Sequence, residues 1–490
     1  MKKRSLWISA CAALAVSGAL AGCGSTFFFA GRTLPPSGIT NRVLIAIQNP
    51  SALAKGALQF VDAFYDIRQS SNDKTASFSI SGYSGALPIT IQNMPEEQLG
   101  AVYGSGDGSF TTVNYEKEAT TGSVPGLNGP SSSIFITRNQ AFVFAANQSS
   151  HLFTVVNETS AATIPLSLPG IYRVSVNPGG SVALAFVQNS DYLYYARQLS
   201  SAQTQAYSGG PATWPKAAAD CEPQNAPTWC LFQAQSPDAV DATGNYYGAP
   251  LVFDRPVKAL FSADGGTAYI LNCGPECGGT KASVSVLPVS PLIFLVGKQG
   301  GLLPCNSAPC TNGNTKPMGR ISTPGGASNA LLDSSTMYVV GQQEQPDGLF
   351  GGYLTVVNTK NGAASAPVSI SDGTPGAPSR MILADDDTLW IAMTKCTSGE
   401  RFAHGRPYGC LTMYNTSSGK VVLLEPYIGD ATGIAAVTGL HKLYTAQGGQ
   451  VYIYSTKDGS QIDNQYVTVT GTAWDVAYMD APTDGDNTVY

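Results

Sequence analysis

The sequence predicts an all-β protein built from a repeated unit of four short strands. Three observations lead to this prediction: a strand pattern that recurs about every 40 residues, abundant glycine and few charged residues. Glycine occurs 53 times in 490 residues and charged residues make up 12% of the chain, whereas typical globular domains have about 7% glycine and about 25% charged residues. A turn-rich chain of this composition is typical of all-β proteins outside the cytoplasm.

The N-terminus predicts export and a lipid anchor. A basic start at 2–4 (KKR) precedes an apolar run at 6–21 that ends in LAGC at 20–23, and the run is too short and too rich in Ala and Gly for a good spanning helix. The ending resembles the lipobox of bacterial lipoproteins. This resemblance implies that residues 1–22 form a signal peptide and that Cys23 carries a diacylglyceryl thioether and an acyl chain such as palmitate. An ordinary cleaved signal with a chance cysteine is the alternative.

The anchor would place the protein in the cell envelope, with the membrane as a partner through its lipid. Gly24 follows Cys23 where Asp would favour the inner membrane, so in a bacterium with two membranes we expect the outer one. Residues 23–40 contain two prolines and are predicted to form the lipidated N-terminus and a flexible tether. A single domain at 41–490 follows.

The repeat is clearest in a short apolar strand that ends in Asn. Its best copies are FTTVN at 110–114, FTVVN at 153–157, LTVVN at 354–358 and LTMYN at 411–415. A second strand lies upstream of each copy, and an inner strand and a turn come before that. Four strands joined by turns and repeated at this period predict a β-propeller.

These repeats resemble those of YVTN-type propellers, a group that includes lactonase-like proteins. The resemblance covers residues 87–469 in its rhythm, and the nearest turn matches are VNPG at 176–179 and SADG at 262–265. It implies a fold of seven or eight four-stranded blades, and the repeat count gives eight. The segment WDVAY at 474–478 reads as an inner strand without later partners, so we expect 42–47, 61–67 and 76–80 to close the ring and leave no open sheet edge.

Eight cysteines remain after Cys11 and Cys23. They fall as sequence neighbours, and an even count in an exported chain predicts disulfides. The expected pairs are Cys221–Cys230, Cys273–Cys277, Cys305–Cys310 and Cys396–Cys410. A zinc site of Cys273, Cys277, Cys305 and Cys310 is the alternative, although its spacing lacks the usual tight knuckles. Each pair lies in an oversized repeat, with predicted insertions near 206–250, 272–282, 297–318 and 395–410.

The insertions supply the candidate binding residues. The first insertion holds four aromatic side chains, Trp214, Trp229, Tyr246 and Tyr247, and the last holds Arg401, His404 and Arg406. The functional interpretation is a recognition surface with aromatic anchors and a basic cluster for an anion. The alternative is that the tryptophans fill a small core of their own loop and that the basic cluster is solvated.

No sequence motif indicates catalysis. A nucleophile elbow, a zinc motif and a phosphate loop are all lacking, and we assign no catalytic or metal-ligating residue. Asp484 and Asp486 faintly resemble a calcium loop without its closing glutamate, so calcium is the less favoured alternative to no cofactor. The net charge of −6 argues against nucleic acid, which needs a basic surface.

The sequence therefore favours a lipid-anchored propeller that binds a small molecule, a glycan or an envelope protein without catalysis. The alternative is a hydrolase of sugar lactones, which the lactonase-like resemblance implies. None of that group's functional residues can be placed on matching positions of this chain.

Overall fold

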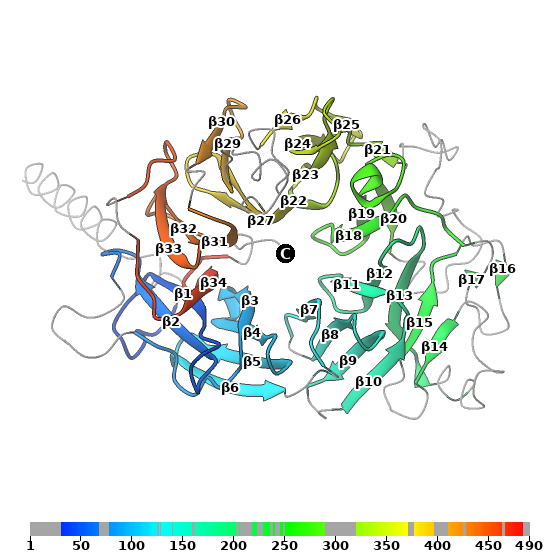
Figure 1. The fold of residues 1–490 in the computed structure, drawn as a ribbon. Coiled ribbons are helices and arrows are strands. Elements are labelled where there is room, and N and C mark those ends of the chain that lie inside the picture. Colours follow the sequence, from blue (N-terminus) through cyan, green and yellow to red (C-terminus); the bar gives the residue numbers. More distant parts are fainter. Residues whose placement is uncertain are drawn as a thin grey trace, which may run out of the picture.

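The computed structural model is a ring of eight β-sheet blades (Figure 1). It describes residues 31–67, 78–124, 127, 129–139, 141–158, 162–201, 205, 218–222, 229–235, 239–240, 246–247, 250–289, 320–370, 377–395, 410–424, 428–462 and 466–483. The predicted all-β propeller is confirmed, and so is the repeat count of eight.

The blades are numbered here around the ring, and their strands are given from the innermost outward. Blade 1 joins both ends of the chain through β34 (Thr472–Tyr478), β1 (Arg42–Gln48) and β2 (Gly56–Asp62). Blade 2 consists of β3 (Pro88–Met94), β4 (Leu99–Gly104), β5 (Ser109–Asn114) and β6 (Ala119–Val124). Blade 3 consists of β7 (Ser133–Ile136), β8 (Phe142–Asn147), β9 (Leu152–Asn157) and β10 (Ala162–Ser167). Blade 4 consists of β11 (Ile171–Val176), β12 (Val182–Val187), β13 (Leu193–Gln198), β15 (Trp229–Gln233) and β14 (Ala218–Cys221).

The second half of the ring repeats the pattern. Blade 5 consists of β18 (Pro256–Phe261), β19 (Thr267–Asn272), β20 (Ser283–Pro288) and β21 (Arg320–Ser322). Blade 6 consists of β22 (Asn329–Asp333), β23 (Thr336–Glu344), β24 (Phe350–Asn358), β25 (Ala363–Ala364) and β26 (Val368–Ser369). Blade 7 consists of β27 (Ala377–Ala384), β28 (Thr388–Thr394), β29 (Leu411–Asn415) and β30 (Val421–Leu424). Blade 8 consists of β31 (Ala431–Val437), β32 (Lys442–Gln447) and β33 (Gln450–Ser455). Outside the blades lie a hairpin of β16 (Ala239–Val240) and β17 (Tyr246–Tyr247) and the 3₁₀ turns η1 (Pro95–Glu97) and η3 (Gly274–Cys277).

The core lies between the blades. Second strands such as β12 (VALAFV) are apolar on both faces and almost wholly buried, because each blade packs face to face on two neighbours. One buried cluster, for example, joins Phe144 and Phe153 of blade 3 to Val174 and Ala183 of blade 4. A strand that packs on both faces needs continuous apolar residues instead of alternation.

The ring closes through its two ends, as predicted. β34 pairs antiparallel with β1, with Val43 opposite Tyr478, and an isolated bridge joins Gln59 of β2 to Ser79. The N- and C-terminal segments therefore complete one blade together, and the ring has no gap between its first and last repeats.

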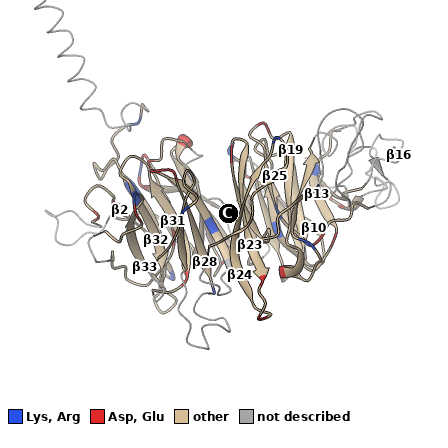
Figure 2. Ribbon diagram, turned by 90° about the horizontal axis from the view of Figure 1, so that it is seen from above, with Lys and Arg blue, Asp and Glu red and all other residues tan. Residues whose placement is uncertain are grey.

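The strands cross the ring from one face to the other (Figure 2). We call the side with the β1–β2 and β19–β20 connections the loop face, and the opposite side the arm face. Part of the predicted tether is ordered on the arm face: Arg32 is buried and its Nη2 donates hydrogen bonds to the carbonyl oxygens of Pro95 and Ala481 at 2.8 and 2.9 Å. The prediction of a flexible tether is thus wrong for residues 32–39, which we call the N-terminal arm.

A buried ionic cluster joins the arm to the closing blade. Arg42 is 1% exposed and forms salt bridges of 2.9 Å with Glu118 and 2.6 Å with Asp480. The backbone N–H and the hydroxyl of Ser37 both donate to Glu118. We call Arg42, Glu118 and Asp480 the closure cluster. Within the described ranges, the structure has no helix that is long and apolar enough to cross a membrane.

Candidate functional site

Two of the four predicted disulfides are present. Cys221 bonds to Cys230, where they join β14 to β15, and Cys273 bonds to Cys277 around η3. Cys410 is also disulfide-bonded, but the predicted partner Cys396 lies outside the described residues, as do Cys305 and Cys310.

The predicted aromatic recognition surface is not supported at Trp229. This side chain is fully buried and contacts the rings of Phe142 and Phe144 edge-on, at centroid distances of 5.3 and 5.4 Å. It therefore fills the core between blades 3 and 4 and not a separate core of its own loop, which was the alternative interpretation. The inserted segment contributes two outer strands, β14 and β15, to blade 4.

Of the other candidate loop residues, the structure describes only the backbone of Tyr246 and Tyr247. Tyr246 and Tyr247 form β17, which pairs with β16, and their side chains are not described. Trp214, Arg401, His404, Arg406 and the lipidation residue Cys23 lie outside the described residues. Among the candidate loop residues, only the side chain of Trp229 lies in the part of the chain that the structure describes.

A different set of residues meets at the centre of the ring. In each innermost strand, one residue pairs with the fifth residue of the second strand of the same blade, and we take this residue as the equivalent position. In six of the eight innermost strands, a β-bulge comes directly before this residue. These equivalent positions are Thr90, Ser133, Arg173, Lys258, Asn329, Arg380, Gly433 and Asp475. A β-bulge changes the direction of the side chain that follows it. The bulge recurs in six innermost strands, and it brings the side chains at these positions to one level of the ring. We call this set the axial ring.

Hydrogen bonds run around the axial ring from blade to blade. The Nζ atom of Lys258 donates to Oδ1 of Asn329 at 2.7 Å, and Nδ2 of Asn329 donates to the carbonyl oxygen of Ser379 at 2.9 Å. Arg173 donates to the carbonyl oxygen of Val257 at 3.3 Å. The layer is therefore held by contacts between neighbouring blades.

The axial ring carries three basic side chains and one carboxylate. The carboxylate, Asp475, is 1% exposed and pairs with Arg380 at 3.1 Å. Burial raises the pKa of Asp475 to about 6, although Arg380 and the backbone N–H groups of Ile91 and Val476 oppose this shift. No carboxylate offsets the charge of Lys258 in this layer, because the Asp475 carboxylate is engaged by Arg380.

Lys258 is buried in the axial ring beside a neutral partner. It is 6% exposed, and its hydrogen-bond acceptor, the Asn329 amide, is neutral. Burial lowers the pKa of Lys258 well below its ordinary value, and the nearby positive charges of Arg173 and Arg380 lower it further. Within the described chain, Lys258 forms no salt bridge.

Gly433 is needed where Arg380 reaches Asp475 across blade 8. A Cβ atom at Gly433 would lie 2.4 Å from Oδ1 of Asp475 and 2.6 Å from its Cα. Both distances are below any real Cβ contact, so the position requires glycine for close approach.

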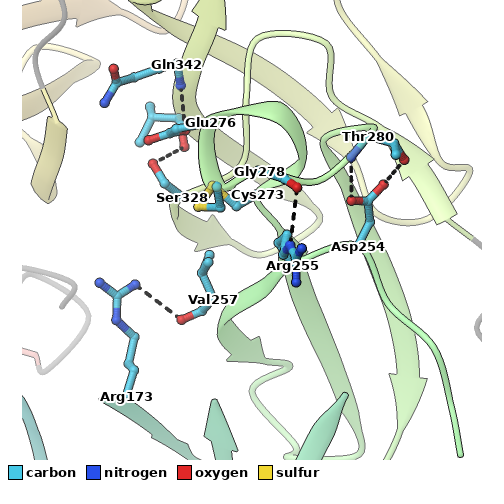
Figure 3. The surroundings of a disulfide bond; sticks show 12 residues. Arg173, Asp254, Arg255, Val257, Cys273, Glu276, Gly278, Thr280, Ser328 and Gln342 are labelled. Carbon is cyan, nitrogen blue, oxygen red and sulfur yellow. Dashed lines mark hydrogen bonds between the residues drawn. A yellow bond between two sulfur atoms is a disulfide. The ribbon is translucent and has the colours of Figure 1, made fainter. Parts of the chain in front are cut away.

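The Cys273–Cys277 disulfide spans η3, which carries one more carboxylate with a shifted pKa. Glu276, in η3, accepts a hydrogen bond from the backbone N–H of Gln342 at 2.9 Å and one from the hydroxyl of Ser328 (Figure 3). Burial raises the pKa of Glu276 to about 7, against the effect of these hydrogen bonds and of Arg173. Arg173 thus lies near enough to Glu276 for its positive charge to favour the ionised carboxylate.

The site has the features of a binding or acid–base centre. Ionisable groups with shifted pKa values tend to gather at functional sites, and here Lys258 and Asp475 occupy equivalent positions of the repeat while Glu276 lies in η3. Among the described residues, no three His, Cys, Asp or Glu side chains are grouped so that they could hold a metal ion.

Comparisons with known proteins show similarity of architecture only. No protein-family model matches the sequence, and no curated protein matches it. Similar solved structures include a dihydro-heme d1 dehydrogenase in complex with DHE (9% identity, TM-score 0.49, covering 92% of this chain and 79% of that one). They also include a periplasmic gluconolactonase from Pseudomonas aeruginosa (13%, 0.39, 89% and 98%) and hydrazine synthase from Kuenenia stuttgartiensis (13%, 0.44, 79% and 99%). At these values the likenesses carry no argument about function, and the fold assignment as an eight-bladed propeller rests on the strand pairing of this chain.

Proposed function

We propose that this protein is a lipid-anchored propeller of the cell envelope that binds a small anionic ligand at the axial ring without catalysing a reaction. The observation that carries the proposal is the excess of positive charge there: the axial ring holds Arg173, Lys258 and Arg380 but one carboxylate, Asp475, which pairs with Arg380. A buried cation without a counter-charge is costly. A bound anion would supply the counter-charge that Lys258 lacks.

The chemistry of the layer favours a carboxylate or a phosphate as the bound group. Guanidinium groups bind both in a bidentate manner, and a lysine adds a point charge. The neutral members Thr90, Ser133 and Asn329 would contact hydroxyl groups of the same ligand. A sugar acid combines these two kinds of group.

Isothermal titration calorimetry of the full-length protein with gluconate and with inorganic phosphate tests the binding site. We expect saturable heat for at least one probe, and at least about tenfold weaker binding by Lys258→Met, because a hydrogen bond to a charged group contributes about 1.5–3 kcal/mol. Lys117→Met, which removes the same charge from an exposed turn of the arm face, is the matched control. Equal binding by the two variants would contradict the proposal.

The envelope location is supported by the lipobox-like LAGC at 20–23 and by the disulfides, which form and persist in oxidising compartments. Cys23→Ala should abolish labelling with a palmitate analogue and release the protein from the membrane fraction. A Cys23→Ala protein that stays in the membrane fraction would contradict the anchor.

A hydrolase of sugar lactones is the second candidate, and Glu276 is the observation in its favour. A carboxylate with a pKa near 7 suits a general base, and Arg173 nearby would stabilise the oxyanion formed when water attacks a lactone carbonyl. Hydrolysis of gluconolactone by the wild type that is lost in Glu276→Gln, with gluconate binding retained, would favour this candidate over simple binding.

A further inference from the structure

The N-terminal arm fixes the face of the ring from which the anchor leaves. The arm is held at both ends, by Arg32 on the carbonyl oxygens of Pro95 and Ala481 and by Ser37 on the Glu118 carboxylate. Pro95 begins the β3–β4 turn and Glu118 lies in the β5–β6 turn, and both turns belong to the arm face. The chain that precedes Arg32 therefore starts from the arm face.

The same face presents an exposed aromatic pair. Phe64 and Tyr65 are 59% and 67% exposed and contact each other with centroids 4.9 Å apart. They follow β2 at its arm-face end, where Asp62 lies opposite Arg42 in the register of β2 against β1. Leu34 of the arm is 54% exposed.

The turn that carries this pair is firmly held. The Lys442 ammonium donates to the carbonyl oxygens of Ala63 and Phe64, and it forms a salt bridge of 2.6 Å with Asp66. Tyr444 also donates to the Asp66 carboxylate. The turn is thus fixed by contacts with β32 of blade 8, and it exposes two large aromatic side chains to solvent.

The distance to the predicted lipid is short. Eight residues, 24–31, separate Cys23 from Arg32, and a fully extended chain of this length spans about 30 Å. A ring tied this closely through its arm face would meet the membrane with that face first.

We propose that the arm face lies on the lipid bilayer, with Phe64 and Tyr65 at the level of the headgroups and Leu34 contributing to the same contact. The proposal rests on the lipid anchor of the proposed function. Aromatic side chains favour the membrane interface, and their apolar area would add to the affinity supplied by the lipid. The loop face, with Glu276 and the nearer end of the axial ring, is then turned away from the membrane.

Site-directed fluorescence quenching tests the orientation. The full-length lipidated protein is purified as Phe64→Cys or as Leu53→Cys, labelled with bimane and placed in vesicles of phosphatidylethanolamine and phosphatidylglycerol with a headgroup nitroxide. Leu53 is the matched control because it is fully exposed at the opposite end of the same blade, in the β1–β2 turn. We expect several-fold stronger quenching at position 64 than at position 53, and the reverse order for iodide in water.

The controls separate the orientation from the anchor. The mass of the N-terminal peptide reports the lipid at Cys23, and circular dichroism reports the fold of each variant. A lipidated, folded protein whose position 53 is quenched as strongly as position 64 would overturn the orientation alone. An unlipidated protein would overturn the anchor and the orientation together, while anion binding at the axial ring would stand.

Discussion

The closure cluster and the axial ring are both buried and charged, but their charges are balanced in opposite ways. In the closure cluster one cation, Arg42, meets two carboxylates, Glu118 and Asp480, and also donates to the carbonyl oxygen of Tyr115 at 2.7 Å. The axial ring holds three cations and one carboxylate, Asp475, which pairs with Arg380 alone. A cluster whose cation is paired within the chain holds the ring closed, whereas the excess positive charge of the axial ring would be balanced by the anion that we propose.

The titration behaviour of the two clusters follows from this difference. Burial disfavours the Arg42 cation, but its hydrogen bond to Asp480 and the negative charges of Asp480 and Glu118 outweigh burial and raise the pKa of Arg42. Burial lowers the pKa of Lys258, and its cationic neighbours lower it further. The protein therefore stabilises the charge of Arg42 and destabilises the charge of Lys258.

The largest effect is expected at the closure cluster. Arg42→Met should lower the free energy of unfolding by about 3–5 kcal/mol, because it removes the cation that pairs with the buried carboxylates of Glu118 and Asp480. Guanidinium chloride denaturation measures the change. Arg138→Met, at a side chain that is 55% exposed, should change stability by less than about 0.5 kcal/mol. Equal losses in the two variants would remove the contrast between buried and surface cations.

The next effect is expected at the glycine of the axial ring. Gly433→Ala should lower the free energy of unfolding by about 1–3 kcal/mol, because the new Cβ atom collides with Asp475. Gly122→Ala, whose Cβ atom would meet nothing within 4 Å, is the control for the same change in β6. A Gly433→Ala protein as stable as Gly122→Ala would show that the Arg380–Asp475 contact tolerates a shift.

Removal of Lys258, which has no salt bridge within the described residues, should change stability in the opposite direction from removal of Arg42. Lys258→Met is expected to leave the free energy of unfolding unchanged or to raise it by about 1 kcal/mol, because it replaces a disfavoured buried amine by an apolar side chain of similar size. Urea denaturation measures it. A loss of 3 kcal/mol or more would instead make Lys258 a structural residue like Arg42.

The smallest effect is a pH dependence. The pKa values of Asp475 and Glu276 are raised to about 6 and about 7, so the stability that their protonated forms contribute is present at low pH and is lost as the pH rises through these values. Melting temperatures at pH 5.5 and 8 should therefore differ less in Glu276→Gln than in the wild type. An unchanged difference would remove Glu276 from the set of titrating groups.

The fold could be predicted from the sequence further than the site could. The 40-residue period and the unpartnered segment at 474–478 predicted the propeller, its eight blades and its closure, since each depends on local strand patterns. The axial ring was not predicted from the sequence, although Arg173 lies in a predicted inner strand. Arg173, Lys258 and Arg380 reach the same level of the ring because of β-bulges, and the sequence does not show where these bulges occur. One signal was available: aligning the inner strands places a basic residue at the same position in three of them.

Two other errors have the same physical origin. Trp229 lies next to a predicted disulfide in an insertion, which suggested an exposed loop, but the insertion adds strands to blade 4 and turns this side chain into the core. The arm is polar and contains Pro35 and Pro36, which suggested a tether, but the bonding partners of Arg32 lie far away in the sequence. Contacts of this kind cannot be read from a local pattern.

The most direct test of the account is the position of an anion in crystals soaked with selenate. Anomalous scattering should place selenium at the centre of the ring, within hydrogen-bonding reach of Lys258 and of the guanidinium groups of Arg173 and Arg380, and the peak should be lost in Lys258→Met. A map with no peak at the axial ring, or a peak that persists unchanged in Lys258→Met, would contradict the claim that this layer is an anion-binding site.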